Sequence, residues 1–259
     1  MLLKTLAVSF LASLAMAAPS TNSTTTSSSS ASSTSTKSLS ADSSSVTNYL
    51  SLGKPTIHVV NNCDATLKVG SAVDVEYFGE TVDVSAGAKH TISPPVGWSG
   101  RVWGRINCSG DKCFESGMGS PATLAEFHFM EDGKVYYDIS LVDGFNLPMV
   151  VAPTVKTDAL TGSNNHWCTS TSCSSLPKCP SGFEVNDAKG KFAGCKSACT
   201  KFNTDEYCCT GNFNSGDTCT TNSYASAVKD ACPEAYSYAY DDSTSVFMCT
   251  SNAYTVTIC

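Results

Sequence analysis

Between Pro55 and Ile106, hydrophobic residues alternate with polar ones in short runs separated by Gly, Pro, Asn or Ser. Alternation with a period of two is typical of a strand that buries one of its faces. Several short strands with a turn signal between them predict a mainly β fold with a β-sandwich core. The expected strands centre on five pairs of hydrophobic residues: Ile57 and Val59, Leu67 and Val69, Val73 and Val75, Val82 and Val84, and Val102 and Ile106.

From Trp167 to Cys232 this alternation is lost, and closely spaced cysteines take its place. The segment predicts a disulfide-rich lobe with short helices. Its clearest helix is expected over Ser223–Ala231, because Ser favours the start of a helix and Pro233 stops it. From Tyr236 to Cys259 the strand-like pattern returns, so we expect the chain to rejoin the sandwich there.

A hairpin is predicted between the strand that holds Phe127 and the strand that holds Tyr137. If their apolar residues share one face, the loop must contain an odd number of residues, and 131–133 (Glu-Asp-Gly) fits with Gly in a left-handed conformation. This register places Glu126 opposite Asp138. Two facing carboxylates cost stability, so either solvent or a neighbouring cation screens them, or they form a glycan-binding site.

The N-terminus has the pattern of a signal peptide over residues 1–17. Lys4 gives a basic start, Thr5–Leu14 is mostly apolar, and Ala15–Ala17 has the small residues of a cleavage site. A membrane anchor is the alternative, but the apolar run is short for a span. With no apolar tail before Cys259 either, we expect no membrane span and no lipid anchor.

Residues 18–53 predict a disordered Ser/Thr-rich stalk. Of the 28 residues from Ser20 to Thr47, 21 are Ser or Thr, and almost nothing there can be buried. The hydroxyl density suits O-glycosylation, and Asn22 begins an N-glycosylation acceptor sequence. An unmodified spacer is the alternative.

The composition narrows the class of protein. Of the 259 residues, 41% are hydrophobic and 15% are charged, with a net charge of −7, which argues against a disordered chain and against nucleic-acid binding. Fourteen cysteines, an even number, indicate an oxidising location, so the protein is expected to be secreted to the extracellular space or cell wall. The spacing of Cys195 and Cys199, and of His166 and Cys168, could also suit zinc, but paired thiols are favoured, and we expect no metal and no cofactor.

Several segments resemble the thaumatin-like proteins, in order along the chain from Pro55 to Cys259, and the preceding stalk is more typical of a fungal member of that family. The resemblance implies a thaumatin-like domain over 54–259, with a sandwich core at 54–105, 128–167 and 236–259, a small loop lobe at 106–127 and a disulfide-rich lobe at 168–235. The matching segments are 102–105 (VWGR), 121–127 (PATLAEF), 137–149 (YDISLVDGFNLPM), 206–210 (EYCCT) and 232–238 (CPEAYSY).

The resemblance also implies a disulfide pattern that uses every cysteine. A further bridge typical of larger members has no counterpart in the short stretch 114–120. The implied pairs are Cys63 with Cys259, Cys108 with Cys113, Cys168 with Cys249, Cys173 with Cys232, Cys179 with Cys195, Cys199 with Cys208, and Cys209 with Cys219.

An acidic cleft is the functional site that the resemblance implies. Glycoside hydrolysis needs one protonated carboxyl group and one carboxylate, for which we expect Glu126 as the acid and Asp143 as the nucleophile or base. Arg105 is expected to orient this cluster, and Asp138 and Asp241 to bind sugar hydroxyls. Asp241 is chosen over the adjacent Asp242 by its distance from the preceding tyrosines.

The expected function is binding, and weak internal hydrolysis, of β-1,3-glucan or another cell-wall polysaccharide by a monomer, in an antifungal or wall-remodelling role. Family members with this cleft occur with and without hydrolysis, so a non-catalytic glucan-binding module is the alternative, and inhibition of foreign carbohydrate-active enzymes is another. Tyr136, Trp103 and Phe145 are candidate aromatic contacts to the sugar.

Overall fold

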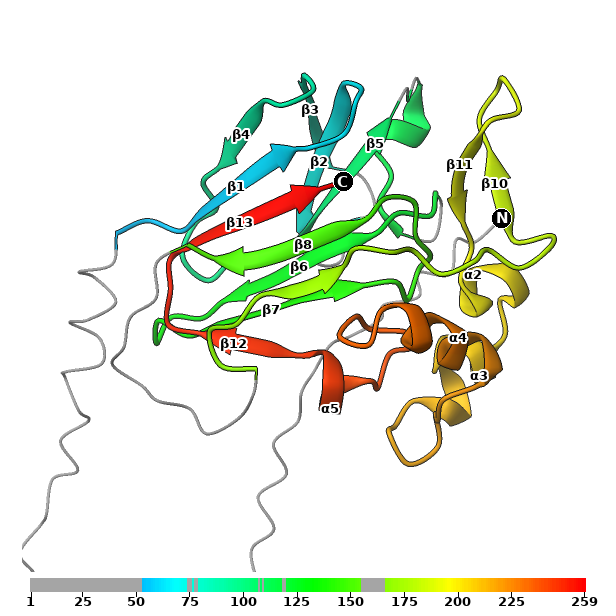
Figure 1. Ribbon diagram of the computed structural model, residues 1–259. Helices are drawn as coiled ribbons and strands as arrows, with labels where there is room; N and C mark the ends of the chain where they lie inside the picture. The colour runs from blue at the N-terminus through cyan, green and yellow to red at the C-terminus, as the bar shows by residue number, and fades with distance from the viewer. Residues whose placement is uncertain are drawn as a thin grey trace, which may run out of the picture. The chain divides into compact units, whose positions relative to one another are not determined.

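The computed structural model describes residues 53–73, 76, 79–106, 108, 110–117, 120–154 and 166–259. The predicted signal peptide, Asn22 and all but the last residue of the predicted stalk lie outside these ranges, as does Val75. Two sheets of five and six strands dominate the fold, and a two-stranded sheet and short helices make up the rest (Figure 1).

The six-stranded sheet has the order β12-β7-β6-β5-β2-β3 and the five-stranded sheet the order β4-β1-β13-β8-β9. The strands of the first are β2 (Leu67–Val73), β3 (Glu80–Val84), β5 (Ser99–Ile106), β6 (Leu124–Phe129), β7 (Val135–Ser140) and β12 (Phe247–Cys249). Those of the second are β1 (Thr56–Asn61), β4 (Lys89–Ile92), β8 (Met149–Pro153), β9 (Thr171–Cys173) and β13 (Ala253–Ile258).

The core lies between the inner faces of these sheets. Tyr254 of β13 is completely buried, and its ring centroid lies 5.3 Å from that of Phe127, 5.8 Å from Phe129 and 5.0 Å from Tyr137. Aromatic rings at these separations contribute stabilisation beyond the area that they bury. The predicted mainly β fold with a sandwich core is therefore confirmed.

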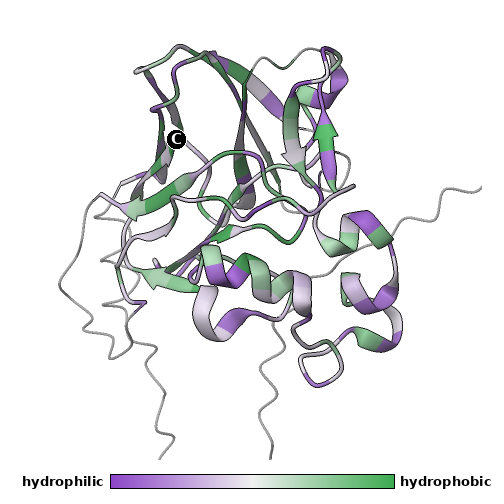
Figure 2. Ribbon diagram, turned by 45° about the vertical axis from the view of Figure 1, so that its right-hand side comes forward, coloured by the Kyte–Doolittle hydropathy of each residue, from purple (hydrophilic) through white to green (hydrophobic). Residues whose placement is uncertain are grey.

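Most of the remaining elements form the disulfide-rich lobe. Its helices carry both hydrophilic and hydrophobic residues (Figure 2). The longest is the predicted helix over Ser223–Ala231, although its cap is Asn222, whose side chain accepts hydrogen bonds from the amides of Tyr224 and Ala225. The elements of the lobe are β10 (Glu184–Asn186), β11 (Phe192–Cys195), α2 (Ala198–Phe202), α3 (Asp205–Cys208), η3 (Gly211–Phe213) and α4 (Ser223–Ala231). Outside it lie two further short helices, η1 (Asp111–Cys113) and α5 (Asp242–Ser245).

Some details differ from the sequence-based expectations. Val73 is the last residue of β2 and does not belong to a separate strand. β6 begins at Leu124, inside the segment 106–127 that was expected to be a loop lobe, and β9 lies inside the expected disulfide-rich lobe. The strand β4 was not predicted, because only Ile92 among its four residues is apolar.

All fourteen cysteines form disulfides, and they join the same seven pairs that the family resemblance implies. The Cys63–Cys259 bridge spans 196 residues, whereas the Cys108–Cys113 bridge spans five. In the described part of the chain, no helix is both long and apolar enough to cross a bilayer.

We predict that the two bridges contribute unequally to stability. Replacing Cys63 and Cys259 together by Ser should lower the free energy of unfolding by about 5 kcal/mol, because a long closed loop restricts the unfolded chain strongly. The matched Cys108→Ser/Cys113→Ser variant should lose about 2 kcal/mol, since its loop is short. Denaturant unfolding of both variants measures the difference, and equal losses would contradict it.

Candidate functional site

Two carboxylates face each other on the outer side of the six-stranded sheet. Glu126 of β6 is paired with Asp138 of β7, and both are half-buried. The hairpin is closed by the amide of Met130, which donates to Lys134 at 2.9 Å, and Gly133 has the positive φ of 86° that the three-residue loop requires. The predicted register is therefore confirmed.

A cation reaches Glu126 from Arg101, which lies opposite it on β5. Its Nε atom is 3.8 Å from Oε1 of Glu126, and its Nη1 atom is 3.9 Å from Oδ2 of Asp143. Only 11% of the Arg101 side chain is exposed, so water screens these interactions less than at an open surface. One guanidinium thus brings together two carboxylates from separate parts of the chain.

Arg105, which the family resemblance placed in this role, lies elsewhere. Its guanidinium is buried and donates to the carbonyls of Pro121 at 2.9 Å, Glu115 at 2.9 Å and Ser120. Burial lowers the pKa of Arg105 to about 10, although the charge of Glu115 opposes this shift. Arg105 therefore holds the loop that precedes β6, and Arg101 is the arginine at the carboxylates.

Asp143 lies in the turn that follows β7, with 19% of its side chain exposed. Burial raises the pKa of Asp143, and the neighbouring charge of Arg101 only partly offsets this effect. A Cβ atom at Gly117 would lie 2.3 Å from Oδ2 of Asp143, so a glycine is needed there to make room for the carboxyl group. A raised pKa suits a proton donor better than the nucleophile or base that the sequence leads us to expect of Asp143.

Tyr236 extends the site beyond the edge of β7. Its backbone pairs with Ser140, and its hydroxyl donates to Oδ1 of Asp242 at 2.6 Å. Burial raises the pKa of Tyr236, and the negative charges of Asp138, Asp242 and Glu126 raise it further. The phenol consequently stays protonated, donates to Asp242, and lies within electrostatic reach of Asp138 and Glu126.

Asp241, the residue chosen from the sequence, is engaged in other contacts. Its carboxylate lies 2.8 Å from Nζ of Lys229, and it accepts hydrogen bonds from Ser237 and Thr244. It is buried, with 7% of the residue exposed. Asp242 is thus the member of this pair that the structure links to the cluster, and sequence spacing alone could not distinguish the two.

The candidate aromatic contacts separate into buried and exposed residues. Trp103 is fully buried and Phe145 is 4% exposed, so neither can stack on a ligand. Tyr136, two residues before Asp138 on β7, is 37% exposed and lies on the same outer face. Of the three residues, it is the one available to a bound sugar.

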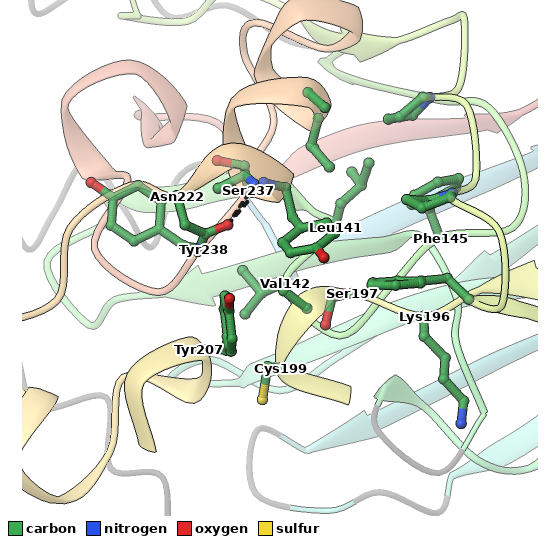
Figure 3. Close-up of a pocket in the computed structure, with 18 of the residues that line it drawn as sticks. Leu141, Val142, Phe145, Lys196, Ser197, Cys199, Tyr207, Asn222, Ser237 and Tyr238 are labelled. Carbon is green, nitrogen blue, oxygen red and sulfur yellow. Dashed lines mark hydrogen bonds between the residues drawn. The ribbon is translucent and has the colours of Figure 1, made fainter. Parts of the chain in front are cut away.

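A separate apolar cavity of about 40 Å³ lies between the turn after β7 and the disulfide-rich lobe (Figure 3). Leu141, Val142 and Phe145 line it from the turn, Tyr207 lines it from the lobe, and Tyr238 lines it from the segment that follows the lobe. Such a volume holds only one or a few water molecules. It is a packing gap beside Asp143 and not the carboxylate site. Within the described ranges, no group of His, Cys, Asp and Glu side chains is arranged to hold a metal ion.

Comparisons with known proteins agree on the family. The family model described as the thaumatin family matches residues 61–259. Pathogenesis-related protein 5 of Arabidopsis thaliana is 39% identical over 218 residues, 77% of this chain and 87% of that protein. A protein of Prunus avium named glucan endo-1,3-beta-glucosidase is 36% identical over 228 residues, 79% of this chain and 90% of its own length.

Among solved structures, a laminaripentaose-producing beta-1,3-glucanase in complex with laminaritetraose has a similar fold, with a TM-score of 0.53. The match covers 79% of this chain and 98% of that one. At 10% sequence identity, this likeness concerns the fold alone.

We predict that Asp143→Asn changes stability in a pH-dependent way. Because the folded protein holds the Asp143 proton more tightly than the unfolded chain does, the stability from this group is complete at low pH and is lost as the pH rises through the raised pKa. Asparagine does not titrate, so the variant should gain stability relative to the wild type between pH 3 and pH 7. Thermal unfolding at both pH values measures this gain, and a constant difference would contradict it.

The two arginines should differ in structural importance. Arg105→Met leaves three loop carbonyls without their donor and should lower the free energy of unfolding by about 3 kcal/mol or more. Arg101→Met removes longer contacts to partly exposed carboxylates and should cost about 1 kcal/mol. Denaturant unfolding of both variants tests this order, and a larger loss for Arg101→Met would reverse the assignment.

Proposed function

This chain belongs to the thaumatin family, and we propose that it binds β-1,3-glucan on the outer face of the six-stranded sheet and cleaves it internally. The observation that carries the proposal is the contact of one arginine with two carboxyl groups, of which one has a raised pKa. Hydrolysis of a glycosidic bond needs such a pair, one group protonated and the other ionised. The name of the Prunus avium relative supports the choice of substrate.

In the proposed mechanism, Asp143 donates a proton to the oxygen of the scissile bond as that bond breaks. Burial favours the protonated form of this group, so it can act as an acid nearer to neutral pH than an ordinary aspartate. The ionised Glu126 either attacks the anomeric carbon or takes a proton from the attacking water. One water molecule is consumed, and both carboxyl groups then return to their starting protonation.

This assignment reverses the roles that were expected from the sequence. Glu126 was expected to be the acid because a second carboxylate lies opposite it. In the structure, however, Arg101 contacts Glu126 and provides a counter-charge, whereas Asp143 is the group whose pKa burial raises. Asp138 and Asp242 are assigned to the hydroxyl groups of the sugar, with Tyr236 keeping Asp242 in position.

We place this activity outside the cell, in contact with a cell wall. Seven disulfides form and persist only where the surroundings are oxidising, and no cysteine of the chain is left unpaired. The seven bridges and the relatives named as pathogenesis-related proteins support this location. An antifungal or wall-remodelling role would follow from either binding or cleavage.

We predict that the wild type releases reducing ends from linear β-1,3-glucan and that Glu126→Gln and Asp143→Asn each lower the rate by about 10²- to 10⁴-fold. The measurement is reducing-end release by secreted protein, with folding checked by thermal unfolding. Glu80→Gln is the matched control, because this exposed carboxylate of β3 lies on the far edge strand of the same sheet.

The outcomes separate the two parts of the proposal. Sedimentation of the wild type with insoluble glucan, without any release of reducing ends, would leave a binding module and remove the hydrolytic step. If the wild type neither sediments with the glucan nor releases reducing ends, the proposal as a whole is overturned. Loss of activity in Glu80→Gln would show that the rate falls when any carboxylate of the sheet is removed, and that the effect is not specific to this cluster.

A further inference from the structure

We propose that Tyr136, Met248 and Trp167 form a second, uncharged subsite that stacks on the pyranose rings of the same β-1,3-glucan chain. This inference rests on the proposed function and extends it by assigning residues that bind sugar without touching the carboxylates. The three residues are called the stacking row below. They belong to three neighbouring segments at one edge of the six-stranded sheet.

The backbone pairing brings the row together. β12 lies beside β7 at the edge of the sheet (Figure 1), and Met248 is paired with Tyr136. On its other side, Met248 forms a parallel bridge with Trp167: its amide donates to His166 at 3.2 Å, and its carbonyl accepts from Cys168 at 2.8 Å. Because neighbouring strands lie about 4.8 Å apart, Tyr136 and Trp167 are separated by about 10 Å, with Met248 between them.

Tyr136 and Met248 point away from the core. The residues that alternate with them are buried on the inner face, including Tyr137 and Phe247, as well as the Cys168–Cys249 disulfide. Side chains of a strand point alternately to its two faces, so Tyr136 and Met248 lie on the outer face. Trp167 is bridged to Met248 beside them, and part of its side chain also packs against the core. Tyr136 is 37% exposed, and Met248 and Trp167 are half-buried.

The row continues the carboxylate site on the same face. Tyr136 lies two residues from Asp138 along β7, which corresponds to about 7 Å. His128, which is exposed and paired with Tyr136, stands in the same relation to Glu126 on β6. A glucan chain bound at the carboxylates and running toward β12 would therefore pass over Tyr136 and reach Trp167.

The chemistry of the row matches a neutral sugar. A phenol, a thioether and an indole carry no charge, and their flat or flexible apolar surfaces fit the C–H faces of pyranose rings. An exposed hydrophobic residue standing alone needs no explanation, but here the exposed Tyr136 is in register with two half-buried apolar side chains beside a polar site, which indicates a binding surface. The carboxylates would then recognise the bond to be cleaved, while the row holds the rest of the chain.

The test measures binding of a linear β-1,3-linked glucose hexasaccharide by calorimetry, on the Glu126→Gln background so that the sugar stays intact. Tyr136→Ala and Trp167→Ala should each raise the Kd about tenfold, in the range typical of aromatic hot spots. Tyr136→Phe and Trp167→Phe keep a ring and should raise the Kd less. These ring-retaining variants also replace any alanine variant that does not fold, as judged by thermal unfolding.

Tryptophan fluorescence provides a readout that a purely structural role would not change. Trp103 is fully buried, whereas Trp98 and Trp167 are both half-buried against the core. A change in emission on sugar binding should vanish in Trp167→Phe, which assigns the change to Trp167. The matched control is Phe192→Ala, which removes an aromatic ring that is 51% exposed on β11, in a different sheet. Its Kd should equal that of the parent.

The failure of this inference can be told apart from failure of the proposed function. If the Glu126→Gln parent and the wild type both bind no hexasaccharide, the proposed function fails. If the parent binds and the alanine variants bind equally well, with the emission change retained in Trp167→Phe, only the stacking row is overturned. Equal weakening by Phe192→Ala would also overturn it, because the effect would not be specific to this edge of the sheet.

Discussion

The parallel pairing of β1 with β13 is the constraint on which the rest of the structure depends. Six consecutive residue pairs, from Thr56 with Ala253 to Asn61 with Ile258, join the two ends of the domain, and the Cys63–Cys259 bridge closes the end of this ladder. Parallel strands need a crossover between them, and here the crossover is the whole intervening chain. The pairing also places Tyr254 between the sheets, where it contacts the aromatic residues of β6 and β7.

This packing fixes the outer face through the alternation of side chains along the strands. Phe127 and Tyr137 are held in the core, so Glu126 and Asp138, their neighbours in sequence, are held on the outside at a fixed separation. The turn that carries Asp143 is fastened separately. Asn146 donates to the carbonyl of Gly104 at 2.8 Å and accepts from the amide of Thr123 at 3.0 Å, which ties this turn to β5 and to the residue before β6.

The sequence predicted those parts of the structure that local rules determine. The parity of the hairpin loop was enough to place Glu126 opposite Asp138, and the end signals of α4 gave its correct range. Arg101 and Arg105 lie on one strand face and cannot be distinguished by alternation. What separates them is the loop that ends at Pro121, whose carbonyls take up Arg105, and that contact is tertiary. The same holds for Trp167, whose place depends on a bridge to Met248 far along the chain.

The electrostatics of the site explain why a neutral surface beside it is useful. Glu126 and Asp143 contact one guanidinium, Asp138 is paired with Glu126, and burial shifts Asp143 toward its protonated form. Any sugar contact made by these groups changes as their protons move during hydrolysis. A contact made by uncharged rings does not change in this way, because it depends on buried area and shape. Binding through the stacking row and chemistry at the carboxylates can therefore be adjusted independently, although both belong to the same face of one sheet.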